Sequence, residues 1–247
     1  MAKTYLITGA TSDVGHALME RLLPKLGEED CIIAQGSGDL ERILDLCQAY
    51  PGKIRTFSVD LSDPEAITAF TEAVAAICPT PTHFVHLPAL RAINTKFKKF
   101  DQDRFDLDMN VQIKSAVQLC KAFLPKMAKA KFGRVLFIQS SYTIGCPPKN
   151  MSAYVMAKSA LGGLAKSLAI EYAAFGVTVN SVAPSMKETN FLSDTPDLIV
   201  QASAADNPMG RHCRVSDVVP AMEFLLSDEA GFITGVTLPI TGGSTIA

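Results

Sequence analysis

The feature that most constrains this chain is a regular alternation of short apolar runs with longer amphipathic stretches. The runs are rich in β-branched residues and are typical of buried strands, whereas the stretches between them place apolar residues at helical spacing. The predicted strands are residues 4–8, 31–35, 54–59, 83–87, 135–139, 177–182 and 236–240. The predicted helices are residues 14–26, 40–50, 64–78, 103–129, 153–175 and 216–227.

This alternation predicts an α/β fold with a Rossmann-like, doubly wound parallel sheet of seven strands. Strands that are apolar without a clean polar face belong in a parallel sheet that helices cover on both faces. No linker rich in proline, glycine or serine interrupts the pattern, so we expect residues 1–247 to form one domain. The long irregular stretch after the sixth strand exceeds the usual loop length and predicts a substrate lid at about residues 185–214.

Composition and charge argue against several kinds of protein. A net charge of -2 leaves no basic footprint for nucleic acid, because the basic run at residues 96–99 is followed by acidic residues up to Asp108. No segment reaches the roughly 18 apolar residues of a membrane helix, and the opening apolar run is too short for a signal peptide, so we expect a cytoplasmic protein. The six cysteines show neither CxxC pairs nor metal-ligand spacing, which predicts reduced thiols and no metal.

A glycine-bearing turn follows the first predicted strand and opens the first helix. Backbone N–H groups and the helix dipole attract phosphate oxygens at such a turn, while the glycines allow a tight bend and close packing. The turn therefore predicts a dinucleotide site, although an ordinary strand-to-helix turn is the alternative. The candidate phosphate contacts are Gly9, Thr11, Ser12, Asp13, Val14 and Gly15.

A tyrosine and a lysine stand one helical turn apart near the start of the fifth predicted helix. Tyr154 and Lys158 share a helix face, and Ser141 lies thirteen positions before the tyrosine, just after the fifth strand. A free tyrosine, with a pKa of about 10, is a poor proton acceptor at neutral pH, and a neighbouring ammonium favours the phenolate. This spacing predicts a site for proton transfer.

Together the glycine turn and these polar residues resemble the short-chain dehydrogenases/reductases. The turn is similar to the family's TGxxxGxG motif, and Asn110, Ser141, Tyr154 and Lys158 resemble its catalytic tetrad in order and spacing. The resemblance implies that Tyr154 is the general acid/base and that Ser141 hydrogen-bonds the substrate oxygen. It further implies that Lys158 lowers the tyrosine pKa and holds the nicotinamide ribose, and that Asn110 supports a water relay.

The same resemblance implies further contacts with a nicotinamide cofactor. Ser37 stands where the family recognises the ribose 2' position, and the absence of an acid there favours NADP(H) over NAD(H), although we find no nearby Arg or Lys. Asp60 is expected beside the adenine, with a simple helix-entry role as the alternative. The remaining cofactor candidates are Leu61, Leu87, Pro88, Tyr154, Lys158, Pro184, Met186 and Thr189.

Three positions depart from the family pattern. Asp13 replaces the middle glycine of the turn, and we expect its carboxylate to turn away from the pyrophosphate and cap the helix. Residues 86–89 are His-Leu-Pro-Ala instead of Asn-Asn-Ala-Gly, and Ser185 replaces a glycine after the sixth strand. His86 either replaces a lost polar contact or is only structural. These departures motivate an alternative hypothesis, a nucleotide-binding regulatory protein with weak catalysis.

The expected activity is hydride transfer between NAD(P)(H) and a carbonyl or secondary alcohol. The chain most resembles 3-oxoacyl-[acyl-carrier-protein] reductases, with sugar or polyol dehydrogenases as the alternative, so the substrate is a small carbonyl, an alcohol or an acyl thioester. By the same resemblance we expect a homotetramer through residues 103–129 and 153–175. The candidate pocket walls are Tyr142, Ile144, Cys146, Met151, Phe191, Leu192 and Met209, and Lys149, Lys187 and Arg211 could meet an anionic group.

Overall fold

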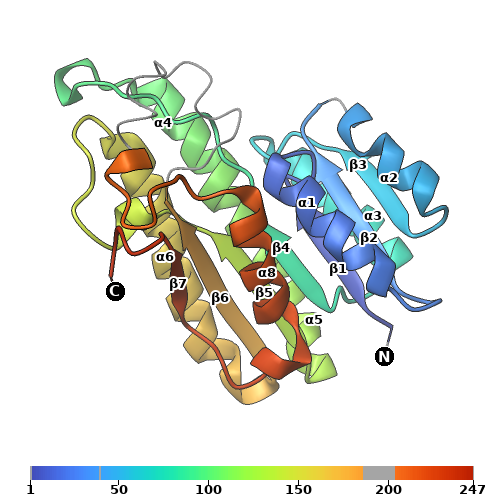
Figure 1. Cartoon of the computed structure of the whole chain (residues 1–247). Coiled ribbons are helices and arrows are strands. Elements are labelled where there is room, and N and C mark those ends of the chain that lie inside the picture. The colour runs from blue at the N-terminus through green and yellow to red at the C-terminus, as the bar shows by residue number, and fades with distance from the viewer. Residues whose placement is uncertain (1, 39, 186–203, 247) are drawn as a thin grey trace.

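The computed structural model describes residues 2–38, 40–185 and 204–246, and its strands form one parallel sheet (Figure 1). The order β3-β2-β1-β4-β5-β6-β7 confirms the predicted doubly wound architecture of seven parallel strands. The strands are β1 (Thr4–Thr8), β2 (Cys31–Gly36), β3 (Ile54–Ser58), β4 (His83–His86), β5 (Gly133–Ile138), β6 (Val177–Pro184) and β7 (Thr237–Ile240).

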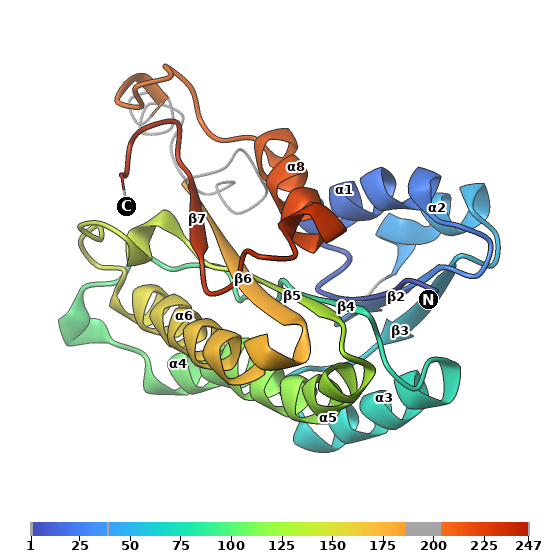
Figure 2. The same ribbon diagram turned by 90° about the horizontal axis from the view of Figure 1, so that it is seen from below.

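Helices cover both faces of the sheet, as Figure 2 shows. One face carries α1 (Asp13–Leu22), α2 (Leu44–Ala49) and α8 (Val215–Leu226), and the other carries α3 (Pro64–Ile77), α4 (Gln102–Met109), α5 (Ser115–Ala130) and α6 (Ser152–Tyr172). Alternate strand residues enter separate apolar cores, with Ile7 in the α1/α8 layer and Leu6 in the α3/α5/α6 layer. This alternation explains why the strands lack a polar face.

The helix predicted over residues 103–129 is present and contains a π-helical bulge. The π turn, Asn110–Lys114, joins α4 to α5 without a break. The carbonyl of Gln112 within this turn accepts a hydrogen bond from the buried His86 ring, which competes with regular helical bonding. The bulge therefore begins at the predicted catalytic Asn110.

The sheet has a topological switch point between β1 and β4. β1 pairs with β2 on one side and with β4 on the other, so the chain moves outward from β1 in both directions. Ligands of doubly wound sheets bind at the carboxyl ends of the strands beside such a point. The fold therefore brings the turn after β1 and the end of β4 to the same edge.

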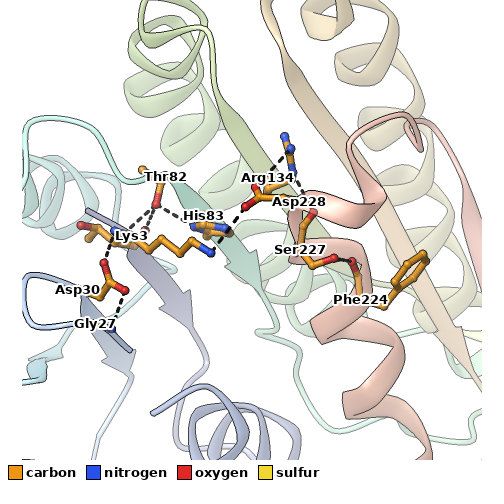
Figure 3. A network of polar contacts seen from close by, with 10 residues as sticks. Lys3, Gly27, Asp30, Thr82, His83, Arg134, Phe224, Ser227 and Asp228 are labelled. Atoms are coloured by element: carbon orange, nitrogen blue, oxygen red, sulfur yellow. Dashed lines mark hydrogen bonds and ion pairs between the residues drawn. The ribbon is translucent and has the colours of Figure 1, made fainter. Parts of the chain in front are cut away.

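The opposite edge of the sheet holds a polar network, drawn in Figure 3, that is buried at His83 and Arg134 and exposed at Lys3 and Asp228. His83 stacks on Tyr5 with ring centroids 4.1 Å apart, and its Nδ1 lies 2.8 Å from Thr82 Oγ1. Arg134 donates to the carbonyls of Gly133 and Ser227 and lies over Phe132. Burial, followed by the charges of Lys3 and Arg134, lowers the pKa of His83 to about 3. This histidine is neutral in the folded protein.

We predict that acid destabilises the protein through His83. The folded-state pKa of about 3 lies below the ordinary value of 6.5, so protons bind preferentially to the unfolded chain as the pH falls from 6.5. Each such histidine makes the free energy of unfolding fall by about 1 kcal/mol per pH unit in that window. Urea unfolding followed by circular dichroism at several pH values measures the slope.

His83→Phe removes one of the titrating groups and keeps an aromatic ring in the stack. Thr82 Oγ1 is not left without a partner, because it retains its 3.1 Å hydrogen bond to the Thr4 carbonyl. The free energy of unfolding of the variant should therefore fall less steeply with decreasing pH, by the contribution of about one proton, whatever its stability at neutral pH. An unchanged slope would show that His83 is not the acid-sensitive group.

Candidate active site and nucleotide-binding turn

The glycines after β1 stand where no larger residue fits. Gly9 has a φ of +70°, and a Cβ there would lie 3.1 Å from the nitrogen of Pro88. A Cβ on Gly15 would lie 2.7 Å from the carbonyl oxygens of Gly9 and Ala10, closer than real contacts allow. The turn is thus held against both the start of α1 and the Leu87–Pro88 backbone after β4, as predicted from the two glycines.

The turn has backbone donors that fit a pyrophosphate. Ser12 caps α1 by accepting a hydrogen bond from the Gly15 amide at 3.1 Å. Within the part of the chain that the structure describes, the amides of Thr11, Asp13 and Val14 have no hydrogen-bond acceptor. Unsatisfied amides at a helix N-terminus bind anions well. The residues present therefore fit the phosphates of a dinucleotide cofactor.

Asp13 does not cap the helix, which corrects the expectation for this residue. Its carboxylate accepts a hydrogen bond from Arg42 at 2.6 Å, while Ser12 makes the cap. Arg42 lies in the short 3-10 turn Glu41–Ile43 that follows β2, and half of its side chain is exposed. The ion pair therefore brings an arginine, five residues after Ser37 in sequence, to the glycine turn.

The predicted adenosine contacts gather near the ends of β2 and β3. Gly36 approaches the turn closely, since a Cβ there would lie 2.9 Å from the Thr11 methyl group, and Ser37 follows it in an exposed position. Asp60 is exposed and accepts hydrogen bonds from the Ser62 amide and hydroxyl, at 2.8 and 2.7 Å. Leu61 is buried in the apolar core.

Only part of the predicted lid lies among the described residues. Pro184 ends β6, and the Ser185 amide donates to the Ile240 carbonyl at 3.0 Å. A cavity of about 540 Å³ lies between residues 207–217 and the end of β7; Met209 and Arg211 line it, but none of the four tetrad candidates does. The predicted contacts Met186, Lys187, Thr189, Phe191 and Leu192 lie outside the described residues.

Lys158 anchors α6 to the end of β5. The lysine is only 2% exposed, and its Nζ donates to the carbonyl of Ile138 at 3.0 Å. The same ammonium lies 6.0 Å from the ring centroid of Tyr154, one helical turn earlier. The predicted pairing of tyrosine and lysine on one helix face is therefore present in the structure.

The side chain of Ser140, the residue before the predicted Ser141, hydrogen-bonds Tyr154. Ser140 also accepts a hydrogen bond from the Tyr142 amide at 3.3 Å, which fixes its side chain at the start of the turn after β5. Ser141 is equally buried, but its carbonyl makes the described hydrogen bonds, to the amides of Ile144 and Gly145.

Burial raises the pKa of Tyr154 to about 12. The hydrogen bond from Ser140 lowers this pKa, whereas the neighbouring Tyr142 and Asp108 raise it further. In this structure Tyr154 therefore holds its proton at neutral pH, as a proton donor must.

His86 makes a structural contact that links Thr8, at the end of β1, with the π turn that contains Asn110. Its Nε2 lies 3.0 Å from the Gln112 carbonyl, so Nε2 carries the hydrogen, and its Nδ1 accepts from the Thr8 hydroxyl at 2.9 Å. Complete burial lowers the pKa of His86 to about 3, and the ring stays neutral. Nearby, Asn110 Oδ1 is buried without a described partner, which suits an acceptor for a bound water.

Two further features are absent from the described ranges. No group of three or more His, Cys, Asp or Glu side chains is placed to hold a metal ion there. Likewise, none of the helices between residues 2 and 246, outside the undescribed segments, combines the length and apolar character needed to cross a membrane.

Comparison with known proteins places the chain among reductases. A family model described as enoyl-(acyl carrier protein) reductase matches residues 10–245. The 3-oxoacyl-[acyl-carrier-protein] reductase FabG of Haemophilus influenzae is 32% identical over 243 residues, which cover 98% of this chain and 97% of that protein.

Solved structures agree with this placement. A 3-oxoacyl (acyl-carrier-protein) reductase from Agrobacterium tumefaciens with NADP bound is similar with a TM-score of 0.87 and 29% identity, covering 98% of this chain and 93% of that one. An NAD+-bound xylitol dehydrogenase has the same TM-score at 23% identity, covering 98% of both chains, and shows the fold alone. The glycine turn, the Tyr154–Lys158 pair and these full-length matches together show that the chain belongs to the short-chain dehydrogenase/reductase family of NAD(P)-dependent oxidoreductases.

Proposed function

We propose that the protein reduces 3-oxoacyl thioesters with NADPH, and that Ser140, Tyr154 and Lys158 carry the chemistry. The observation that carries this proposal is the hydrogen bond between Ser140 and a Tyr154 whose burial keeps it protonated. When bound, the cofactor supplies the hydride that is added to the carbonyl carbon. A protonated phenol beside the carbonyl oxygen favours reduction, since the oxygen needs a proton as the hydride arrives.

Each residue has a distinct role in this proposal. Tyr154 donates its phenol proton to the substrate oxygen, and Ser140 donates a hydrogen bond that stabilises the negative charge there. Lys158, buried beside the phenol, stabilises the negative charge of the phenolate that remains after proton transfer. Asn110, in the π turn, holds a water through its free Oδ1, from which a proton can be returned.

The substrate class follows from the relatives, not from the pocket. The matched reductases from Haemophilus influenzae and Agrobacterium tumefaciens are named for 3-oxoacyl groups on a carrier protein, and the similarity extends over nearly the whole chain. The xylitol dehydrogenase shares too little sequence to argue for a polyol. We therefore favour a thioester over a sugar or polyol.

We also propose that Arg42 gives a preference for NADPH over NADH. Position 37 is a serine without negative charge, and the nearby guanidinium can form charge-assisted hydrogen bonds with a 2'-phosphate. Asp13 competes for the same guanidinium in the structure, at 2.6 Å. Binding of the phosphate would exchange one anionic partner of Arg42 for another.

Assembly as a homotetramer remains part of the proposal. Figure 2 shows α4, α5 and α6 lying side by side on one face of the molecule. Leu107, Val117 and Met156, one from each of these helices, are between 41% and 46% exposed, and Gly163 has open space where a Cβ would be. Half-exposed apolar residues on adjacent helices support an interface between copies of the chain.

Substitutions at the proton donor and its serine test the proposed chemistry. Tyr154→Phe should lower kcat for reduction of a 3-oxoacyl thioester by about 10²- to 10⁴-fold while NADPH binding persists, because only the proton donor is lost. Ser140→Ala should lower kcat by about 10²-fold through loss of a hydrogen bond to the developing oxyanion. Steady-state kinetics with NADPH absorbance measure both.

Ser141→Ala is the matched control, since it removes an adjacent and equally buried hydroxyl. We expect it to retain nearly full activity. If Ser141→Ala were the inactive variant and Ser140→Ala the active one, the serine assignment would be reversed. A wild-type protein that binds nucleotide without turnover would instead support a regulatory role.

A substitution at Arg42 tests the proposed preference for NADPH. Arg42→Ala should raise the Kd for NADPH by about 10-fold and leave the Kd for NADH nearly unchanged, because only NADPH has the 2'-phosphate. Fluorescence titration with each cofactor measures the ratio. Arg55→Ala, which removes an exposed arginine from β3, is the control and should change neither value. Equal losses for both cofactors in Arg42→Ala would refute the assignment.

A further inference from the structure

The structure brings three lysines of one short run next to a fourth that is far away in sequence. Lys96, Lys98 and Lys99 are exposed in the segment between β4 and α4, and Lys149 is exposed in the segment between β5 and α6. The Thr95 amide donates to the carbonyl of Asn150 at 2.9 Å, so the two segments lie against each other. Lys96, Lys98, Lys99 and Lys149 are called the lysine patch below.

The lysine patch is a positive region on a chain that is negative as a whole. Residues 89–104 contain five basic and two acidic residues, whereas the whole chain has a net charge of -2. None of the four lysines forms an ion pair with another described residue. Uncompensated like charges at one place repel one another, so the patch favours an anionic partner.

Three of the four acidic residues that follow in sequence are hydrogen-bonded within their own helix. Asp101 caps α4 through the Arg104 amide, and Asp106 accepts from the side chain of Gln102. Asp108 is buried and accepts from Gln112 at 2.6 Å. The fourth, Asp103, is exposed. The acidic run therefore balances the basic run less fully than the sequence alone suggests.

An exposed aromatic side chain stands among the lysines. Phe97 is 71% exposed, although its ring lies 5.5 Å from that of Phe100. A large apolar group surrounded by cations suits a partner surface with carboxylates around an apolar contact, rather than a small inorganic ion.

The lysine patch lies beside the catalytic tyrosine. Asn150 is four residues before Tyr154, and α6 begins at Ser152. In both views the segment before α4 projects at the end of the molecule where α6 starts, next to the loop that follows β5 (Figure 1, Figure 2). A partner seated on the patch would therefore stand at the mouth of the site that contains Tyr154.

We propose that the lysine patch, with Phe97, docks an acidic acyl carrier protein that delivers its thioester to Tyr154. The inference rests on the proposed reduction of 3-oxoacyl thioesters. A carrier protein meets the three observed requirements, since it is anionic, has a protein surface for Phe97 and must bring its acyl group beside the tyrosine. Docking by charge mainly accelerates association and weakens as salt screens the lysines.

The test compares two forms of one substrate. A 3-oxoacyl chain is presented either on an acidic acyl carrier protein or on N-acetylcysteamine, which is neutral and small. The combined variant Lys96→Glu, Lys98→Glu and Lys99→Glu should lower kcat/KM for the carrier-bound substrate by about 10-fold or more, because attraction becomes repulsion. Its kcat/KM for the N-acetylcysteamine thioester should stay at the wild-type value.

Single reversals provide a matched control. Lys98→Glu should lower kcat/KM for the carrier-bound substrate, whereas Arg55→Glu, an equal charge change on β3, should not. Loss on both thioesters in the combined variant, or loss on neither, would overturn the docking assignment. If the wild-type protein reduces neither thioester, the proposed reaction fails, and calorimetric titration with the carrier protein decides docking separately. Binding that the combined variant weakens would support it, and equal binding would overturn it.

Discussion

The hydrogen bond from the Lys158 ammonium to the Ile138 carbonyl is the interaction on which the geometry of the site depends. Burying an ammonium is costly unless acceptors replace its water, so this contact fixes α6 against the end of β5. Tyr154 is one turn earlier on the same helix and is thereby held beside Ser140, the second residue after the strand. The parallel sheet supplies the Ile138 carbonyl at its carboxyl edge, and Lys158 holds Tyr154 at that edge by binding it.

Two departures from the family pattern are compensated within this chain. Asp13 brings a carboxylate into the nucleotide turn, and Arg42 pairs with it, so the turn retains free amides for phosphate. His86 replaces an amide residue and joins β1 to the π turn through Thr8 and the Gln112 carbonyl. Both compensations consist of polar groups that find partners from other elements, which is what burial requires.

The sequence was sufficient for the fold and for the pairing of Tyr154 with Lys158 on one helix face, but not for contacts between residues distant in sequence. Short apolar runs and helical patterns predicted all seven strands and the covering helices because burial on both faces dictates them. The π turn at Asn110–Lys114 was missed, since the buried His86, 26 residues before Gln112, hydrogen-bonds a carbonyl within it. The hydrogen bond of Ser140 to Tyr154 and the ion pair of Arg42 with Asp13 were missed for a related reason. Spacing along the chain does not report loop length or the reach of a long side chain across a turn.

The most direct test of this account is a spectrophotometric titration of the Tyr154 phenolate, taken as the difference between wild-type protein and Tyr154→Phe. The account predicts a midpoint near pH 12, because burial outweighs the hydrogen bond from Ser140. It also predicts a still higher midpoint in Ser140→Ala, since that hydrogen bond favours the phenolate. A midpoint at or below the ordinary value of about 10 would mean that Lys158 already stabilises the phenolate. It would contradict the assignment of Tyr154 as a protonated donor.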